Sequence, residues 1–358
     1  MTSQVFPADQ LTELTTTIFK AVGCHDNEAE VIAKRLVNAN LSGHDSHGII
    51  RIAKYVDWIE QGGAVINQEI DILTDNGSVV VVDGKWGMGQ SIGEQTMNLA
   101  IARAREHGVA VVALRNSGHL GRIGDWPEMA VKAGMLSVHF VNTSGMGNLV
   151  APFGGKERRL SANPFAAGVP VKDGPPLILD MSACTVAEGK IRVAMHAGKQ
   201  VPENCLIDSD GNPTTDPATF YGDPDNGVKP GSILPIAGHK GYALSMIIEM
   251  MAGALTGGSC TNPAKADRLA NGMLTIVMDR SAFMSEDEFY DEVSRYVDYV
   301  KSSAPIREGV EIIVPGEFEA RTRGQRSANG IELAATTMLQ INDVCKRYEL
   351  DEPFTVDG

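Results

Sequence analysis

Side chains that could bind and protonate a small acid lie close together in the segment Ser46-His47-Gly48-Ile49-Ile50-Arg51. If a helix begins near Gly48, His47 and Arg51 are four positions apart and project from one face. An arginine can hold a carboxylate through two parallel hydrogen bonds, and a histidine can exchange a proton with an adjacent oxygen near neutral pH. The pair therefore suits a 2-oxo acid. The alternative is that Ser46 caps the helix and that His47 and Arg51 form a solvated surface pair.

A second histidine, His119, lies between Gly118 and Gly121, just past the apolar run Val109–Leu114. That run predicts a buried strand, and open α/β sheets place ligands at the carboxyl ends of their strands. The position predicts a histidine that rigid backbone holds within reach of a substrate. The alternative is a loop histidine that is hydrogen-bonded to the backbone.

The glycine run Gly87-Met-Gly89-Gln-Ser-Ile-Gly93 follows a predicted strand and opens a predicted helix, as a dinucleotide-binding turn does. Its spacing is GxGxxxG, however, and the next strand ends in Leu114-Arg115-Asn116 without the acidic residue that holds a ribose. We therefore interpret the run as a tight turn and a helix start.

A cofactor that carries phosphates needs backbone donors and a cation. Three glycine-containing stretches could supply them: Gly145–Gly147, Gly238–Gly241 and Pro315–Glu317. Lys240 directly precedes a predicted helix, where free backbone N–H groups add to its charge. We favour Lys240 for a cofactor phosphate or ribose, and the alternative is an exposed loop lysine.

The elements that must position these residues differ between the ends and the middle of the chain. The first sixty residues predict only helices, the third of them from Gly48 to Glu60. A βαβ unit is predicted next, with a strand at Val79–Val82, a helix at Ser91–Glu106 and a strand at Val109–Leu114. Further expected strands include Leu136–Val141, Phe165–Val169, Leu177–Leu179, Leu274–Met278 and Val310–Val314, and further helices Val186–Ala197, Gly241–Leu255 and Glu286–Lys301. Residues 198–238 predict a long surface excursion, because they are rich in Gly, Pro, Asp and Asn.

We therefore expect two domains. Residues 1–75 and about 315–358 would form a helical domain, and residues 76–314 an α/β domain that carries the site.

Composition limits the partners of the chain. Its 358 residues include 31 basic and 45 acidic ones, and the net charge of −14 repels nucleic acid and anionic membranes. A small anionic substrate must then be held by locally placed cations. The five dispersed cysteines form no CxxC pair, and no signal peptide or membrane-spanning run is visible, which predicts a cytoplasmic protein with reduced thiols.

In their order along the chain, several motifs resemble the malate/L-lactate dehydrogenase-like NAD(P)-dependent oxidoreductases. The resemblance runs through Ser46–Arg51, Asn116–His119, Pro152–Gly155, Asn163-Pro164, Leu179–Met181, Gly198-Lys199, Gly211–Pro217 and Lys240–Tyr242. It implies a non-Rossmann fold, a mixed sheet flanked by helices, in which the N- and C-terminal helical segments join. It also implies a homodimer with the active site near the interface.

The resemblance also assigns roles to residues. His47 and His119 are implied to be catalytic, together with Ser46 beside His47, and Arg51 and Asn163 are implied to bind substrate. The cofactor positions that it implies are Thr143, Asp180, Met181, Ser182, Lys240, Gly316, Glu317 and Phe318. The chain departs from the family pattern at Ser161-Ala162-Asn163-Pro164, where relatives commonly have Gly-Thr-Asn-Pro, and at Cys205, where they often carry an aromatic residue.

These observations predict an NAD(P)-dependent oxidoreductase that interconverts a small, malate-like or lactate-like 2-hydroxy acid and its 2-oxo acid, with NAD preferred to NADP. One alternative is an NADPH-dependent reductase of a cyclic imino acid. Another is a metal-dependent hydrolase or lyase with His44, His47 and His119 as ligands, although no carboxylate completes a set at metal spacing and we expect no metal. The third is a non-catalytic binding protein.

Overall fold

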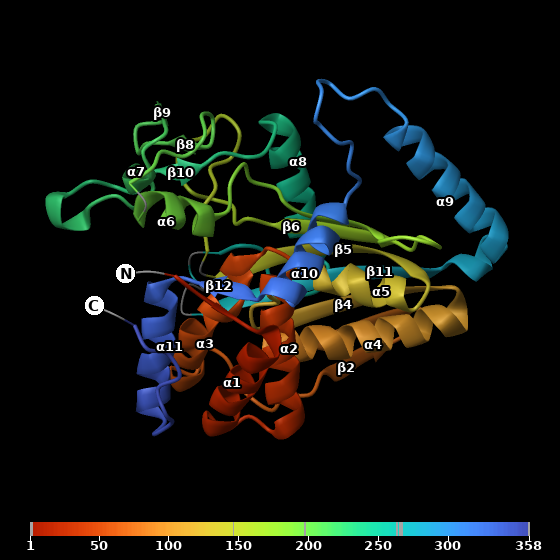
Figure 1. The fold of residues 1–358 in the computed structure, drawn as a ribbon. Coiled ribbons are helices and arrows are strands. Elements are labelled where there is room, and N and C mark those ends of the chain that lie inside the picture. The colour runs from red at the N-terminus through yellow and green to blue at the C-terminus, as the bar shows by residue number, and fades with distance from the viewer. Residues whose placement is uncertain (1–2, 146, 197, 263, 265–267, 357–358) are drawn as a thin grey trace.

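The computed structural model describes residues 3–145, 147–196, 198–262, 264 and 268–356 (Figure 1). Within them, a mixed seven-stranded sheet has the order β2-β3-β4-β11-β5-β6-β7. Its strands are β2 (Asp71–Asp75), β3 (Val79–Asp83), β4 (Val109–Ser117), β5 (Met135–Gly145), β6 (Pro164–Val169), β7 (Leu177–Ser182) and β11 (Leu269–Asp279). β3 and β4 are parallel and the other neighbours antiparallel, so the predicted mixed sheet and βαβ unit are confirmed.

Two helices cover one face of this sheet, α4 (Gly89–His107) and α5 (Asp125–Lys132). Ile92, Met97 and Trp126 from these helices pack with Val112 and Val141 of the sheet in one buried cluster. Removal of this apolar surface from water stabilises the layer that carries the His119 loop.

The glycine run that opens α4 serves packing, as the sequence predicted for a tight turn and helix start. A Cβ atom at Gly89 would lie 2.1 Å from the carbonyl oxygen of His119, and one at Gly93 would lie 2.3 Å from the Trp126 ring. Both distances are far below van der Waals contact, so only glycine lets α4 approach the His119 loop this closely.

We expect Gly89→Ala to lower the free energy of unfolding by about 1–3 kcal/mol, because the added methyl group must displace the His119 backbone. Chemical denaturation followed by circular dichroism measures the change. Gly324→Ala in α10 (Glu317–Asn329) is the matched control, since a Cβ there meets no atom within 4 Å. Equal stability changes in the two variants would contradict this account of α4.

A buried histidine lies within the sheet. The His139 side chain of β5 is 0% exposed, and its ring nitrogens contact the hydroxyls of Thr275 (3.1 Å) and Ser137 (2.8 Å). Burial lowers the pKa of His139 to about 3. Between about pH 3 and the ordinary value of 6.5, the unfolded chain therefore binds a proton that the folded chain does not.

Because the unfolded state binds more protons in this window, the free energy of unfolding should fall as the pH drops below 6.5. His139→Gln removes this contribution. We expect the loss of stability between pH 7 and pH 5 to be about 1–2 kcal/mol smaller in this variant than in the wild type. Denaturation curves at both pH values test this, with His25→Gln at an exposed position as the control; the same loss in all three proteins would contradict it.

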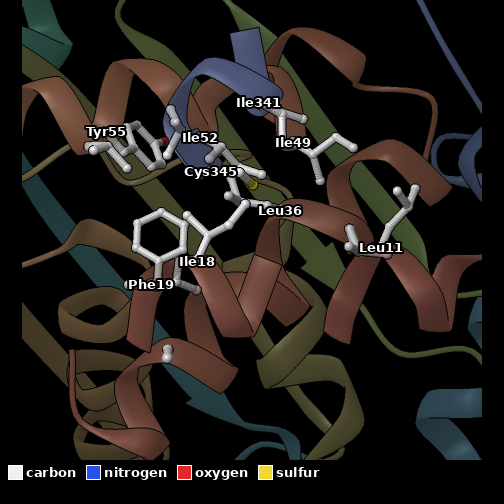
Figure 2. Packing of buried hydrophobic residues seen from close by; sticks show 14 of the residues in the cluster. Leu11, Ile18, Phe19, Leu36, Ile49, Ile52, Tyr55, Ile341 and Cys345 are labelled. Carbon is white, nitrogen blue, oxygen red and sulfur yellow. The ribbon is translucent and has the colours of Figure 1, made fainter. Parts of the chain in front are cut away.

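The two ends of the chain share one buried cluster (Figure 2). Leu11, Leu36 and Tyr55 pack there with Ile341 and Cys345 from the other end. The elements involved are α1 (Ala8–Ala21), α2 (Asp26–Leu41), α3 (Ile52–Glu60) and α11 (Ala335–Arg347), and β1 (Gln4–Phe6) pairs with β12 (Ile331–Leu333). The helical ends thus lie together, although β2, expected in the helical domain, belongs to the large sheet. The two-domain division itself stays a prediction.

On the opposite face of the sheet lies α8 (His239–Ile248), which continues as the π-helical turn η4 (Glu249–Ala254). The helix predicted from Gly241 therefore begins two residues earlier. Residues 198–238, expected as an excursion, carry short elements around buried Leu206, Phe220 and Ile233. These are β8 (Leu206–Ile207), β9 (Pro213–Thr214), α7 (Pro217–Tyr221) and β10 (Ser232–Ile233). They lie next to α6 (Glu188–His196), the helix that was expected at Val186–Ala197. Its expected last residue, Ala197, lies outside the described residues.

The strand predicted at Val310–Val314 was wrong. This segment links α9 (Glu286–Lys301) to α10 without strand structure, and Ile313 is 45% exposed. Its neighbour Pro315 accepts one hydrogen bond from the Ile178 N–H of the edge strand β7, at 3.1 Å. β-branched residues favour a strand only where a partner strand runs alongside, and this segment does not pair with β7.

Candidate active site

The Ser46–Arg51 segment folds differently from the expected single helix. It forms two short 3-10 turns, η1 (Asp45–His47) and η2 (Ile49–Arg51), and α3 begins only at Ile52. Gly48 breaks the helix with an extended backbone, and the Asn40 side chain takes the place of helical hydrogen bonding by accepting the Ile49 N–H at 2.8 Å. A Cβ at Gly48 would lie 2.0 Å from Asn40 Oδ1, so the break depends on glycine.

Despite this correction, the segment and the His119 loop meet. The rings of His47 and His119 stack nearly in parallel, with 5.6 Å between their centroids and an angle of 13° between their planes. Ser46 does not cap a helix, because its hydroxyl contacts His47 Nδ1 at 3.0 Å. His47 and Arg51 are half-buried, which contradicts the alternative of a solvated surface pair.

Arg51 contributes a guanidinium group to the histidine pair. Its Nε donates to the carbonyl oxygen of Ser46 at 2.6 Å, which fixes the guanidinium beside the histidines. Within the described residues, no side chain or carbonyl pairs with its two terminal nitrogens. These nitrogens can donate two parallel hydrogen bonds to a carboxylate.

Sequence reasoning missed the partners of His119. The Tyr55 hydroxyl lies 2.7 Å from His119 Nδ1, and Gln90 Nε2 donates to the Tyr55 oxygen at 3.0 Å. The His119 ring is therefore not simply hydrogen-bonded to the backbone. Tyr55 follows Arg51 by four positions, which could have indicated a shared face.

Both histidines are neutral at physiological pH. Burial, and then the positive charge of Arg51, lower the pKa of His47 to about 3. The same causes in the same order, followed by His47, lower the pKa of His119 well below its ordinary value. A second proton on either ring would be poorly hydrated and would lie near a cation.

Two of the predicted cofactor residues are connected to this group. Asn271 Nδ2 donates to the hydroxyl of Thr143 (3.1 Å), and its Oδ1 accepts the N–H of Leu120, next to His119 (2.8 Å). Asp180 accepts the N–H of Gly124 on the same loop at 2.8 Å. The carboxyl end of β5 and the start of β11 thus hold the histidine loop in register.

Arg122 is a further candidate that sequence reasoning missed. Its side chain is 1% exposed and pairs with Asp125 (2.9 Å) and Glu128 (2.8 Å), while Nε and one terminal nitrogen have no hydrogen-bond acceptor. Asp180 Oδ2 lies 4.0 Å from that Nε. Buried donors without acceptors are costly, so they fit a ligand that brings phosphate or amide oxygens. Its place three residues after His119 was visible in the sequence.

The Gly316–Phe318 turn borders a cavity of about 240 Å³ between α5, β7 and α10. Gly316 has φ +89°, and a Cβ there would lie 2.8 Å from the Pro176 carbonyl oxygen. Glu317 is buried and binds Lys301 and Arg321, which lowers its pKa to about 2 and gives it a structural role. Phe318 is 60% exposed.

Other predicted residues lie apart from the histidine pair. Asn163 is 0% exposed and donates to Ser245 and Glu249, both at 2.9 Å. Lys240 is exposed, and none of the described residues pairs with its ammonium group. Met181 and Ser182 are half-buried at the end of β7, and Met146 of the glycine stretch lies outside the described residues. The roles expected for these residues stay predictions.

The sequence profile of the malate/L-lactate dehydrogenase family matches residues 6–342, nearly the whole chain. The chain belongs to this family. Membership of the malate/L-lactate dehydrogenase family explains the missing dinucleotide-binding glycine fingerprint, since the resemblance implied a non-Rossmann fold. It also agrees with the presence of the histidine pair. The function that the motifs predicted is confirmed at the level of an NAD(P)-dependent oxidoreductase acting on the CH–OH group of a 2-hydroxy acid.

Curated relatives within the family carry related names. Hydroxycarboxylate dehydrogenase B of Escherichia coli O157:H7 is 40% identical over 351 residues, which cover 97% of this chain and 95% of that protein. L-sulfolactate dehydrogenase of Methanocaldococcus jannaschii is 35% identical, with 95% and 96% covered. Among solved structures, Δ1-piperideine-2-carboxylate reductase of Pseudomonas syringae pv. tomato superimposes with a TM-score of 0.82 at 27% identity, covering 95% of this chain and 99% of that one.

Membership of the malate/L-lactate dehydrogenase family decides against the metal-dependent hydrolase and the non-catalytic binding protein. His44, a ligand in the former reading, lies 3.4 Å from Glu319 through its Nε2. In the described part of the chain, no three His, Cys, Asp or Glu side chains are arranged to hold a metal ion. None of the described helices is long and apolar enough to cross a bilayer.

Proposed function

We propose that the chain reduces a small 2-oxo acid to the 2-hydroxy acid with Arg51, His119 and His47 in distinct roles. Arg51 holds the substrate carboxylate through its two unpaired terminal nitrogens. His119 gives a proton to the carbonyl oxygen, and His47 orients that oxygen by a hydrogen bond. The observation that supports this assignment is the stacked pair of neutral imidazoles beside an unpaired guanidinium.

The nicotinamide cofactor, when bound, supplies the hydride. Thr143, Asp180 and the unpaired donors of Arg122 would hold it next to the His119 loop, because these groups are tied to that loop by hydrogen bonds or by sequence. The Gly316–Phe318 turn would contribute the wall of the neighbouring cavity. Met181, Ser182 and Lys240 keep the cofactor roles that the family resemblance implied.

We propose NAD as the cofactor. Glu319 lines the cavity at Gly316, and a carboxylate disfavours the additional phosphate of NADP, whereas Glu128 in the same cavity is already paired with Arg122 and Arg323. Lys132 and Arg323 line the same cavity and could bind a phosphate, so NADPH is assayed beside NADH throughout.

A cyclic imino acid is the second candidate substrate, because a reductase named for one superimposes along nearly the whole chain. Arg51 would hold its carboxylate in the same way. His119 would then protonate an imine nitrogen rather than a carbonyl oxygen.

The test is the loss of NADH or NADPH absorbance with purified protein and a chelator. The substrates are oxaloacetate, pyruvate, sulfopyruvate and a cyclic imino acid. We expect oxidation of NADH with at least one 2-oxo acid. Oxidation with the imino acid alone would replace the first candidate by the second, and no oxidation together with no cofactor binding in calorimetry would overturn both.

We also propose a homodimer in the cytoplasm whose interface includes an apolar stripe on α8 and η4. The stripe consists of Met246 and Ile247 of α8, Met250 of η4, and Leu255 directly after η4, and these side chains are 39–61% exposed. A charged surface would repel a second copy of a chain with net charge −14, whereas an uncharged apolar face can pack against itself. The five free thiols support the cytoplasm, and the negative charge supports a small anionic partner rather than nucleic acid or membrane.

We expect the double variant Ile247→Glu/Met250→Glu to be monomeric in analytical ultracentrifugation, while the wild type is dimeric. Tyr299→Glu is the matched control, because Tyr299 is 69% exposed on α9 and outside the stripe. A dimeric double variant, or a monomeric wild type, would contradict the proposed interface.

A further inference from the structure

We infer that Tyr55 and Gln90 are positioning residues that fix the proton of neutral His119 on Nε2 and supply a proton to Nδ1 during reduction. The inference rests on the proposed role of His119 as proton donor. It goes beyond that role because it assigns the tautomer and the source of the proton.

The first step is the direction of the hydrogen bonds. Gln90 Nε2 lies 3.0 Å from the Tyr55 oxygen and 3.4 Å from the carbonyl oxygen of His119. A carbonyl oxygen can only accept, so the group that faces it must be the amide NH₂. Turning the amide around would place the Gln90 oxygen against the carbonyl oxygen of His119, so that two acceptors face each other and this carbonyl loses the Gln90 donor.

The second step follows from the first. Because Gln90 donates to the Tyr55 oxygen, the Tyr55 hydroxyl hydrogen is free to point at His119 Nδ1, 2.7 Å away. Nδ1 is then the acceptor, and the single proton of the neutral ring lies on Nε2. The hydrogen-bond chain thus selects one of two tautomers.

The third step is the rigidity of the chain. The Tyr55 side chain belongs to the buried cluster shared by the two ends of the protein (Figure 2), and Tyr55 and Gln90 are each 1% exposed. Gln90 is the second residue of α4, directly after Gly89, whose close approach to His119 sets the position of the loop. Water cannot easily replace either partner, so the tautomer is a property of the packed core.

The fourth step is the balance of protons. The substrate oxygen takes the proton of His119 Nε2 as hydride adds to the carbon, and the Tyr55 hydroxyl proton moves to Nδ1. His119 stays neutral, and Tyr55 becomes a phenolate that still accepts the Gln90 hydrogen bond. After product release, a proton from bulk water adds to His119 Nε2 from the vacated substrate position, and the proton on Nδ1 returns to the Tyr55 oxygen, which restores the resting tautomer.

The energetics favour this route over a lone histidine. A neutral imidazole that loses its N–H proton without gaining another becomes an imidazolate, which is a stronger base than a phenolate. Burial raises the pKa of Tyr55 to about 12, so its proton stays in place until the transfer begins. His47 and Arg51 also face His119, and the positive charge of Arg51 disfavours the alternative of an imidazolium.

The tautomer can be read directly by NMR of full-length protein labelled with ¹⁵N in its histidine rings. Long-range ¹H–¹⁵N correlations distinguish a protonated Nε2 from a protonated Nδ1, and loss of one signal set in His119→Gln assigns His119. We expect His119 of the wild type to be protonated on Nε2 alone. Tyr55→Phe and Gln90→Leu should each give a mixture, and Tyr348→Phe, which removes a hydroxyl bonded to Glu60, should not.

Kinetics provide the second readout. Tyr55→Phe keeps the ring in the core cluster, and we expect it to lower kcat about 10- to 100-fold with KM and cofactor Kd changed less than about twofold. Protonation of His119 on Nδ1 in the wild type, or an Nε2 tautomer unaffected by both substitutions, would overturn the inference. A protein with the expected tautomer that reduces no 2-oxo acid would instead refute the proposed function and leave the tautomer assignment intact.

Discussion

Replacing His119 by alanine is expected to lower kcat by about 10²- to 10⁴-fold, the usual contribution of a positioned general acid. The expected loss is large because none of the other described residues of this group shares the hydrogen bond of His119 to Tyr55. His47 stacks on His119, but His47 belongs to a different segment of the chain and its Nδ1 contacts the Ser46 hydroxyl. Steady-state kinetics with the best substrate of the panel give kcat, and calorimetry gives the Kd of the cofactor.

The cofactor Kd should change little in this variant, because Thr143, Asp180 and Arg122 are retained. His25→Ala, at an exposed position on the N-terminal side of α2, is the control and should behave as the wild type. Wild-type turnover in the His119 variant would remove this residue from the mechanism and leave His47 as the proton donor.

The second large effect is expected for Arg51→Leu, which should lower kcat/KM for a 2-oxo acid by about 10²-fold or more. This corresponds to the roughly 2–5 kcal/mol that is lost when one partner of a buried, hydrogen-bonded charge pair is removed. The loss should appear largely in KM, since the carboxylate is bound in the ground state and the transition state alike.

A methyl ester of the same substrate provides the matched control, because it lacks the carboxylate. The wild type should prefer the acid strongly, and Arg51→Leu should lose this preference while reducing the ester at an unchanged rate. If the variant still prefers the acid as strongly as the wild type does, Arg51 is not the carboxylate anchor.

The sequence predicted which residues meet at the site better than it predicted their local backbone geometry. His47, Arg51 and His119 were identified by residue type and by their places after a turn and a strand, and the structure brings them together. The helix expected from Gly48 to Glu60 ends as predicted but begins only at Ile52, because the Asn40 side chain, eight residues upstream of Gly48, accepts the Ile49 N–H and Gly48 is extended. Such a side-chain contact leaves no trace in a local pattern.

The partners of the histidines were hidden for a similar reason. Tyr55 resembles an ordinary core residue within an amphipathic helix, and Gln90 lies in a glycine run whose spacing indicates a tight turn and a helix start. Asn163 has hydrogen-bond partners 82 and 86 positions away along the chain. Only the assembled fold shows that these polar groups meet, since neither period nor spacing encodes contacts of that range.

The central claim is that the chain catalyses hydride transfer to the carbonyl carbon of a carboxylate-bearing substrate. The most direct measurement uses NADH or NADPH deuterated at the reactive C4 position, with the 2-oxo acid and a chelator, and locates the label by NMR of the product. We predict one deuterium on C2 of the 2-hydroxy acid. Product without deuterium at C2, or label released into water, would contradict the account.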